Sequence, residues 1–413
     1  MKRRHFSILA SLLLLVCSAM VSCSKDEKEP AAPQTDLPMA GAYITDSTYI
    51  ADKSMTVYHI AYPSKDPYGN DIMLSGTLSF GDGVKNARYA KGMLLYNHFT
   101  IYRANQCPSK GSLLEQGYTS RLSLITISPD YYGFGSTEHH HQAYCLSQTN
   151  AQASVDALLA ARQILAAKGF SWGDLLFNAG YSQGGQTTMG VVRLVAERYP
   201  NINITYSFAG AGSYDLPETY RQFITATIAG MPSTVISVML SYNEFNNLGI
   251  ERAEMFTEPV LSHIDDWILS KRYTRQQIDS LVGSLSLSEY ATATVLDTTS
   301  NLSHTIMAAL DLDNICKGWT PRGDEQLMLF HSSKDITVPS ANSENMYNFL
   351  TTHGVPAGNI DLDIEEIDAD GNNPAHEKAA ETFVVKALFK VMEMLNTPDE
   401  TADKVMKMIK ANK

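Results

Sequence analysis

Apolar runs of strand length alternate along much of the chain with segments whose apolar residues recur at helical spacing. From about Ser54, two strands joined by a turn are predicted by the runs M-T-V-Y-H-I-A-Y and I-M-L-S-G-T-L-S-F and the intervening P-S-K-D-P-Y-G-N-D. Four further strands are predicted by G-M-L-L-Y-N, L-S-L-I-T-I-S, D-L-L-F-N-A-G-Y and I-N-I-T-Y-S-F-A. Two helices are predicted among them, over Asn150 to Ala167 and over Gln183 to Arg198.

The alternation stops between about residues 213 and 321. Strand patterns are weak there, and apolar residues such as Tyr220, Phe223 and Ile224 recur at helical spacing. It resumes with Q-L-M-L-F-H, a helix near Ser343 to Thr352, the run I-D-L-D-I-E-E-I and a final helix. Apolar strands that alternate with helices predict an α/β fold, in which helices flank a mostly parallel, twisted sheet on both faces. The helical stretch is therefore predicted to be an insertion into an α/β domain.

The first residues have the pattern of an export signal. Lys2 to Arg4 are positively charged, and Phe6 to Val21 carry no charge. This apolar run is short for a membrane span and is typical of a signal peptide. The residues A-M-V-S-C at its end resemble a bacterial lipobox, in which Cys23 is diacylated and becomes the mature N-terminus. An ordinary cleaved secretory signal is the alternative.

The residues after Cys23 are polar, charged and rich in proline, beginning S-K-D-E-K-E-P-A-A-P. Such a composition predicts a flexible tether. We therefore expect a lipoprotein signal peptide at residues 1–22, and a lipidated cysteine with its tether at residues 23–53. The acidic stretch also resembles the surface-export signals of some Gram-negative lipoproteins. The expected location is the outer membrane, on its periplasmic or cell-surface face.

Composition narrows the function classes. The chain has 413 residues, of which 44% are hydrophobic and 18% charged, so it is too apolar to be a disordered protein. Its net charge of −12 argues against a nucleic-acid partner, because such a footprint is basic and clustered. After export three cysteines remain, Cys107, Cys145 and Cys316, which allow at most one internal disulfide and lack the spacing of a zinc site. We expect no metal and no organic cofactor.

The strongest chemical signal is G-Y-S-Q-G-G at Gly180 to Gly185. It follows a predicted strand and opens a predicted helix, which is the context of a G-x-S-x-G nucleophile elbow. A sharp turn there exposes the Ser182 hydroxyl at the top of the sheet, and the small Gly180 and Gly184 leave room for the strand to approach the helix. Ser182 is therefore the predicted nucleophile.

A serine nucleophile needs a base, and the base needs an acid that orients it. In this architecture the chain order is serine, acid, histidine. Downstream of Ser182, the run L-F-H-S-S-K-D-I-T-V-P places Asp335 in a loop after a strand, with Asp215 as the rival acid. Of the 11 histidines, His376 follows both partners and is predicted to lie in a loop before the last helix. Asp335 and His376 are the predicted acid and base.

The tetrahedral intermediate of acyl transfer needs two N–H donors for its oxyanion. One predicted donor is the backbone N–H of Gln183, the residue after the nucleophile. The other is predicted in the loop after L-L-Y-N-H-F-T, at Phe99, with His98 adjacent.

Together these motifs resemble an α/β-hydrolase, and they include the loop P-D-Y-Y-G-F-G-S-T at Pro129 to Thr137. The pairing of D-Y-x-G-x-G with a later G-Y-S-Q-G-G resembles the secretory-lipase and esterase branch. The resemblance implies that Asp130 and Tyr131 support the oxyanion loop. It also implies a helical cap inserted after the sixth strand, which gives an α/β-hydrolase core over residues 54–212 and 322–413 and a cap over residues 213–321.

The predicted function is an exported serine hydrolase that cleaves small-molecule carboxylic esters through an acyl-enzyme. One alternative is a serine aminopeptidase or oligopeptidase on the same fold, for which Glu251 and Glu254 are a weak acidic pair. Another is a surface binding lipoprotein without activity. Met231, Val235 and Met239 in the insertion are expected to be core residues, some of which line an acyl pocket. Acyl-chain preference is therefore expected to depend on the insertion.

Overall fold

The computed structural model describes residues 41–111, 119–370 and 374–411, and side chains to residue 407. The predicted signal peptide and Cys23 lie outside the described residues. The described chain forms one nine-stranded sheet in the order β1-β2-β3-β5-β4-β6-β7-β8-β9. The strands are β1 (Tyr43–Ile50), β2 (Met55–Lys65), β3 (Asp71–Gly81), β4 (Tyr89–Asn97), β5 (Leu124–Pro129), β6 (Ser171–Tyr181), β7 (Tyr206–Gly210), β8 (Leu327–Ser332) and β9 (Ile360–Glu365).

Antiparallel pairing is confined to one side of the sheet. β1, β2 and β3 pair antiparallel, and β3 pairs antiparallel with β5. From β5 through β4, β6, β7 and β8 to β9, every pair is parallel. The sheet is mostly parallel, as the sequence predicted, so the carboxyl ends of β4, β6 and β8 meet at one edge.

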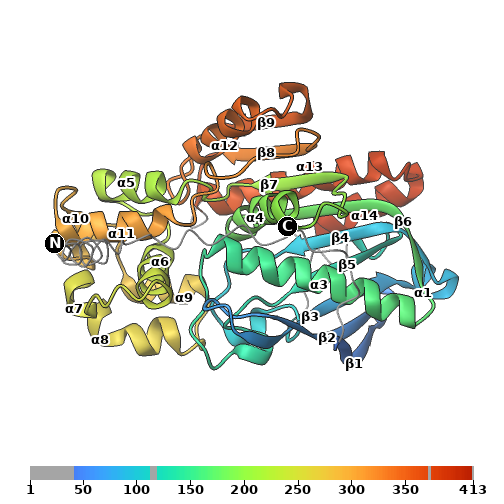
Figure 1. Ribbon diagram of the computed structural model, residues 1–413, viewed down its shortest axis with the longest axis horizontal. Coiled ribbons are helices and arrows are strands. Elements are labelled where there is room, and N and C mark those ends of the chain that lie inside the picture. The colour runs from blue at the N-terminus through green and yellow to red at the C-terminus, as the bar shows by residue number, and fades with distance from the viewer. Residues whose placement is uncertain (1–40, 112–118, 371–373, 412–413) are drawn as a thin grey trace, which may run out of the picture. The chain divides into compact units, whose positions relative to one another are not determined.

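Helices cover both faces of the sheet (Figure 1). In β4, Met93 and Leu95 pack toward α3, whereas Leu94 and Tyr96 pack toward α13, because successive side chains of a strand point to opposite faces. Helices α4 and α12 share a further core cluster with β7 to β9. The helices of this layer structure are α1 (Asp82–Ala87), α3 (Ser147–Ala167), α4 (Gln183–Arg198), α12 (Ala341–Thr352), α13 (Ala375–Met394) and α14 (Asp399–Ala411), with short helices η1 (Ala51–Lys53), η2 (Ala104–Gln106), η3 (Gly135–Thr137) and η6 (Ala357–Asn359).

Two boundaries differ from the sequence prediction. The segment Tyr43–Ile50, expected to be tether, is strand β1 and pairs with β2. Most side chains of this edge strand are exposed, so it lacks the apolar alternation by which a strand is recognised. Helix α13, expected to be the last, is followed by α14.

Between β7 and β8 the described chain forms helices and two isolated β-bridges. Figure 1 draws this helical insertion in yellow to orange, beside one end of the sheet. Its buried side chains, among them Val235, Ile236, Met239 and Phe256, belong to the same apolar cluster as buried residues of α3 and of strands β2 to β5. Its elements are α5 (Leu216–Ala226), α6 (Pro232–Phe245), α7 (Arg252–Met255), α8 (Val260–Ile264), the π-helical η4 (Asp265–Leu269), α9 (Arg275–Val282), η5 (Leu287–Glu289), α10 (Ala293–Leu296) and α11 (Asn301–Asp311).

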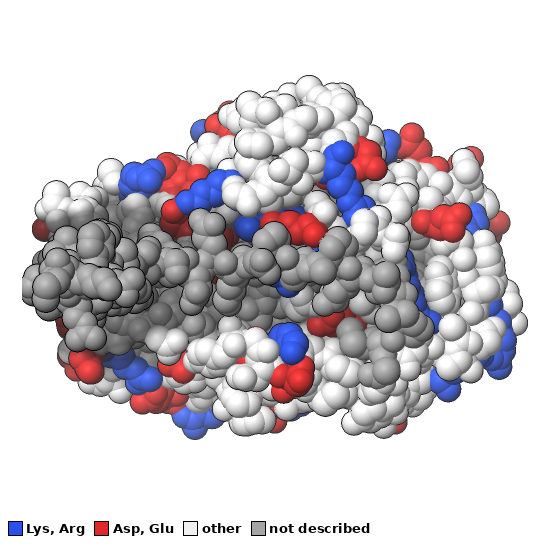
Figure 2. Space-filling model, in the orientation of Figure 1, with Lys and Arg blue, Asp and Glu red and all other residues white. Residues whose placement is uncertain are grey.

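Charged side chains of both signs are interspersed on the described part of the face in Figure 2. None of the helices within the described ranges combines the length and apolarity that crossing a bilayer requires. The thiols of Cys107, Cys145 and Cys316 are all free.

Candidate active site

Ser182 occupies a strained turn between β6 and α4. Its φ of 59° and ψ of −122° lie where residues with a side chain rarely occur. The turn is possible because glycines stand two residues before and two residues after the serine. A Cβ on Gly184 would lie 2.1 Å from the Asn97 carbonyl oxygen, and one on Gly180 would lie 2.3 Å from the Gly184 carbonyl oxygen. At this turn the chain therefore passes so close to β4 and to itself that only glycine fits two residues before and two residues after the serine.

The structure brings Ser182, His376 and Asp335 into one hydrogen-bonded series. The Ser182 Oγ lies 2.7 Å from His376 Nε2, and His376 Nδ1 lies 2.5 Å from Asp335 Oδ2. A carboxylate only accepts hydrogen bonds, so Nδ1 carries the ring proton and Nε2 accepts from the serine hydroxyl. His376 is 3% exposed and Asp335 6% exposed, so both are shielded from water while the serine stays partly exposed.

His376 lies in the first turn of α13, not in the loop before it as the sequence predicted. The helix begins directly after Pro374, and a proline at a helix start is the signal that could have placed this boundary. The Tyr181 hydroxyl donates to the His376 carbonyl oxygen at 2.6 Å. The residue before the serine therefore holds the backbone of the histidine.

The turn after β8 fixes the Asp335 carboxylate. Its Oδ1 accepts from the backbone N–H groups of Thr337 at 2.8 Å and Val338 at 2.9 Å, which leaves Oδ2 facing His376. Burial alone would raise the pKa of Asp335. The positive charge of protonated His376 and the hydrogen bonds to the carboxylate outweigh that effect, and the pKa lies well below its ordinary value.

The sequence analysis did not assign a role to His331. This fully buried residue of β8 donates from Nε2 to the Val338 carbonyl oxygen at 2.7 Å and accepts at Nδ1 from Ser343 at 2.8 Å. Its Nε2 also lies 3.6 Å from Asp335 Oδ2. The histidine thus holds the turn that carries the acid, and its position in a strand gave no signal of this role in the sequence.

Asp215, the alternative candidate for the catalytic acid, lies at the start of a helix. Its Oδ1 accepts from the backbone N–H of Glu218 at 3.2 Å, which makes it the N-cap of α5. Its two oxygens also accept from the side-chain amides of Asn314 and Asn345, each at 3.1 Å. The hydrogen bonds of this carboxylate therefore go to a helix end and two amides, and His376 is paired with Asp335 instead.

The two predicted oxyanion donors are Gln183, which directly follows the serine, and Phe99. Gln183 is the first residue of α4, where an N–H has no acceptor within the helix. The Phe99 side chain lines the same cavity as Ser182. The loop that leads to Phe99 is held by buried His98. The His98 Nε2 lies 3.2 Å from the Asp130 carbonyl oxygen, and the His98 ring stacks on Tyr131 with 4.1 Å between the ring centroids.

Ser182 and His376 open into a cavity of about 350 Å³. This volume is at the lower end of the roughly 300–1,000 Å³ that small-molecule pockets occupy. The strands, the loop after β4 and α13 supply much of the wall, through Tyr96, Phe99, Tyr181, Ala380, Phe383 and Val384.

The insertion supplies Met231, Arg275 and Gln276 to the wall of this cavity. Val235 and Met239, considered from the sequence as acyl-pocket residues, lie instead in the core of the insertion at 3% and 2% exposure. The helical spacing that identified them is the spacing of any buried helix face, so it did not distinguish a core from a pocket.

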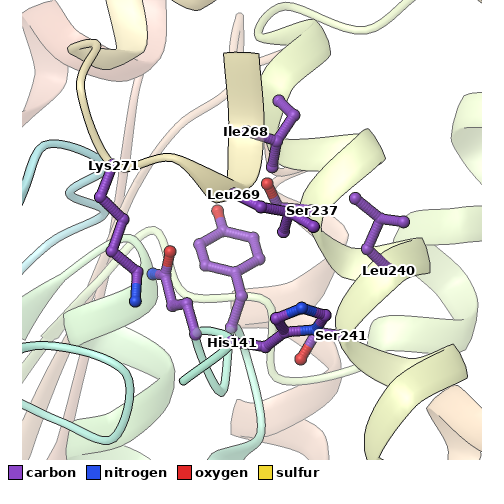
Figure 3. Close-up of a pocket in the computed structure, with 9 residues that line it drawn as sticks. His141, Ser237, Leu240, Ser241, Ile268, Leu269 and Lys271 are labelled. Carbon is purple, nitrogen blue, oxygen red and sulfur yellow. The ribbon is translucent and has the colours of Figure 1, made fainter. Parts of the chain in front are cut away.

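Two cations join the insertion to the rest of the fold. Arg275 pairs with Asp279 on its own helix and with Glu377, next to His376, at 2.5 Å each. Lys271 donates to the carbonyl oxygens of Gly133, Glu138 and His140 at 2.5–2.6 Å. Figure 3 shows Lys271 beside a second cavity of only about 20 Å³, close to the size of one water molecule.

Comparison with known proteins agrees with this fold. The esterase LipA from Xanthomonas oryzae, described as degrading the rice cell wall, has a TM-score of 0.71 and 18% identity over 86% of this chain and 98% of that one. Candida antarctica lipase A in its closed state has a TM-score of 0.63 and 11% identity over 87% of this chain and 82% of that one. These likenesses confirm the α/β-hydrolase fold. None of the curated proteins compared with the chain matches its sequence. The profile of the secretory lipase family matches residues 111–368, more than half of the chain, which therefore belongs to that family and is a carboxylic ester hydrolase.

Proposed function

We propose that the chain hydrolyses carboxylic esters with Ser182 as nucleophile, His376 as general base and Asp335 as the acid that orients the base. The observation that carries this proposal is the hydrogen-bonded series from Ser182 Oγ through both nitrogens of His376 to Asp335 Oδ2. Ser182 Oγ attacks the ester carbonyl carbon while His376 Nε2 takes its proton. Asp335 stays ionised, keeps the proton of the neutral ring on Nδ1 and stabilises the imidazolium that forms.

The tetrahedral intermediate places a negative charge on the former carbonyl oxygen. We assign the backbone N–H groups of Gln183 and Phe99 as its donors, with the positive end of α4 beside them. The alcohol then leaves with the proton from His376, and an acyl-serine remains. His376 next takes a proton from water, the resulting hydroxide attacks the acyl carbon, and the acid is released as Ser182 regains its proton.

We also propose which segments of the chain serve export, anchoring and catalysis. Residues 1–22 would be removed on export, Cys23 would carry the lipid, and a tether ending before Tyr43 would lead to the enzyme. The core would include residues 54–212 and 322–413 together with β1, and residues 213–321 would form a cap over the cavity. Membership of the secretory lipase family supports export, and the contacts of Met231 and Arg275 with the cavity support the cap.

The peptidase alternative has less support. Glu251 and Glu254, its acidic pair, form the capping box of the short helix α7, where the Glu251 N–H donates to Glu254 at 3.0 Å. This arrangement gives both residues a local structural role.

A direct test combines a fluorophosphonate probe with a panel of p-nitrophenyl esters on the wild-type enzyme. We expect one covalent adduct, on the peptide that contains Ser182, and release of nitrophenol that the probe blocks. An adduct on another residue, or ester hydrolysis that continues after complete labelling, would contradict the proposal.

Acid should inhibit turnover through one ionisation. Protonated His376 cannot accept the Ser182 proton, so kcat/KM should fall as the pH decreases. The pKa of Asp335 lies well below its ordinary value, so this carboxylate stays ionised over the same range. A plot of log kcat/KM against pH should therefore have a slope of about one on its acid side. A slope near two would show that a second group must also lose a proton.

Replacing Cys23 with serine should release the enzyme from membranes. Acyl chains bind a bilayer with roughly 0.8 kcal/mol per buried methylene, and serine cannot receive them. After cell fractionation, the Cys23→Ser enzyme should appear in the soluble fraction with the specific activity of the wild type. If it stays with the membranes, the anchor is another part of the chain.

A further inference from the structure

The cavity at Ser182 has an apolar wall that continues away from the serine along α13. His376, Ala380 and Val384 recur every four residues, so they lie on one face of the helix, and Phe383 lies beside them. Tyr96 and Tyr181 line the same cavity, and the centroid of the Tyr181 ring lies 5.2 Å from that of His376 and 5.3 Å from that of Phe383 on this helix. The Tyr181 hydroxyl is occupied by the His376 carbonyl oxygen, so its ring is held against the helix.

The insertion contributes a more polar wall. Arg275 of the insertion forms an ion pair with Glu377 at the start of α13, and the Gln276 amide lies 3.4 Å from the Glu377 carboxylate. An alkyl chain placed against these groups would remove them from water without replacing their hydrogen bonds, which is costly. Met231 is the apolar side chain that the insertion supplies among the described lining residues.

We propose that the acyl chain of the ester lies along α13, between Ala380 and Val384 on the helix and the two tyrosines, and not within the helical insertion. This inference rests on the proposed function, because it assigns a binding place to the acyl group that Ser182 receives. The alcohol part of the ester then faces Arg275 and Gln276. In this arrangement α13 supplies both the base and the acyl-binding surface.

The same geometry limits the length of the chain. Val384 is just over two helical turns from His376, or about 12 Å along the axis. A fully extended chain advances about 1.2 Å per bond, by the geometry that gives an extended peptide up to about 3.6 Å per three-bond residue. The stripe therefore accommodates roughly ten carbons, fewer than a long fatty acid has.

The test measures kcat/KM for p-nitrophenyl acetate, butyrate, octanoate, decanoate and palmitate. In the wild type kcat/KM should increase with length up to the medium-chain esters, by at most about fourfold per buried methylene, and decrease at palmitate. Val384→Trp should move the optimum to butyrate, and Val384→Ala should move it toward longer chains. The alanine variant removes atoms from a partly exposed side chain, so it keeps the test open if the tryptophan variant does not fold.

Two further variants complete the design. Phe389→Trp alters the exposed side of the same helix and should keep the wild-type profile. Met231→Trp alters the insertion wall. If Met231→Trp moves the optimum and both Val384 variants leave it unchanged, the acyl chain lies against the insertion and this inference is wrong, although the proposed function stands. If the wild type neither reacts with a fluorophosphonate nor cleaves any ester of the panel, both proposals fail.

Discussion

Replacing Ser182 with alanine should lower ester turnover on the order of a million-fold and abolish labelling by fluorophosphonate. The other members of the series cannot form the acyl-enzyme without the hydroxyl, and removing the nucleophile of a triad costs about as much as removing the whole triad. Residual hydrolysis of roughly 10³–10⁴-fold over water should remain, because the oxyanion donors and the cavity still bind the substrate. Stopped assays with a chromogenic ester and intact-mass spectrometry of the labelled protein measure both quantities.

A matched control is Ser288→Ala, which removes an exposed hydroxyl of the insertion. That variant should keep wild-type turnover and labelling. If the Ser182→Ala enzyme is folded but labels at the wild-type rate, another residue is the nucleophile and the assignment of His376 and Asp335 loses its basis.

The nucleophile could be predicted because its determinants are contiguous. A strand that contains Gly180, the serine and a helix that contains Gly184 follow one another, and the predicted helix Gln183 to Arg198 has the bounds that the structure gives to α4. The acid loop at Asp335 could be predicted for the same reason, since it directly follows β8. In each case residues within one short segment determine the conformation.

The features that the sequence did not predict depend on contacts between distant segments. β1 is held by backbone pairing with β2, which leaves no apolar pattern in its own residues. His331 holds the acid turn through Val338 and Ser343, and a histidine in a strand gives no sign of such partners. The cavity wall combines Tyr96 and Val384, which are nearly three hundred residues apart in sequence. Periodicity marks both as buried positions of their own elements, and only the packing of α13 on the sheet shows that they face the same space.

Replacing Asp335 with asparagine should lower turnover by about 10⁴-fold while the fold is kept. The backbone N–H groups of Thr337 and Val338 both donate to Oδ1, so the carbonyl oxygen of the new amide would take that position. Its NH₂ group would then face His376 Nδ1, which must become an acceptor. The ring proton would move to Nε2. This nitrogen would then face the Ser182 hydroxyl as a donor and could not accept its proton.

The comparison with Asp215→Asn makes this prediction specific. The amide oxygen of that variant could still accept from the Glu218 N–H, and asparagine caps a helix about as well as aspartate, so turnover should change little. Circular dichroism and thermal unfolding of both variants would show whether a loss of turnover comes from unfolding. If Asp215→Asn had the large loss and Asp335→Asn the small one, the catalytic acid would be Asp215. The 2.5 Å contact between Asp335 and His376 would then have only a structural role.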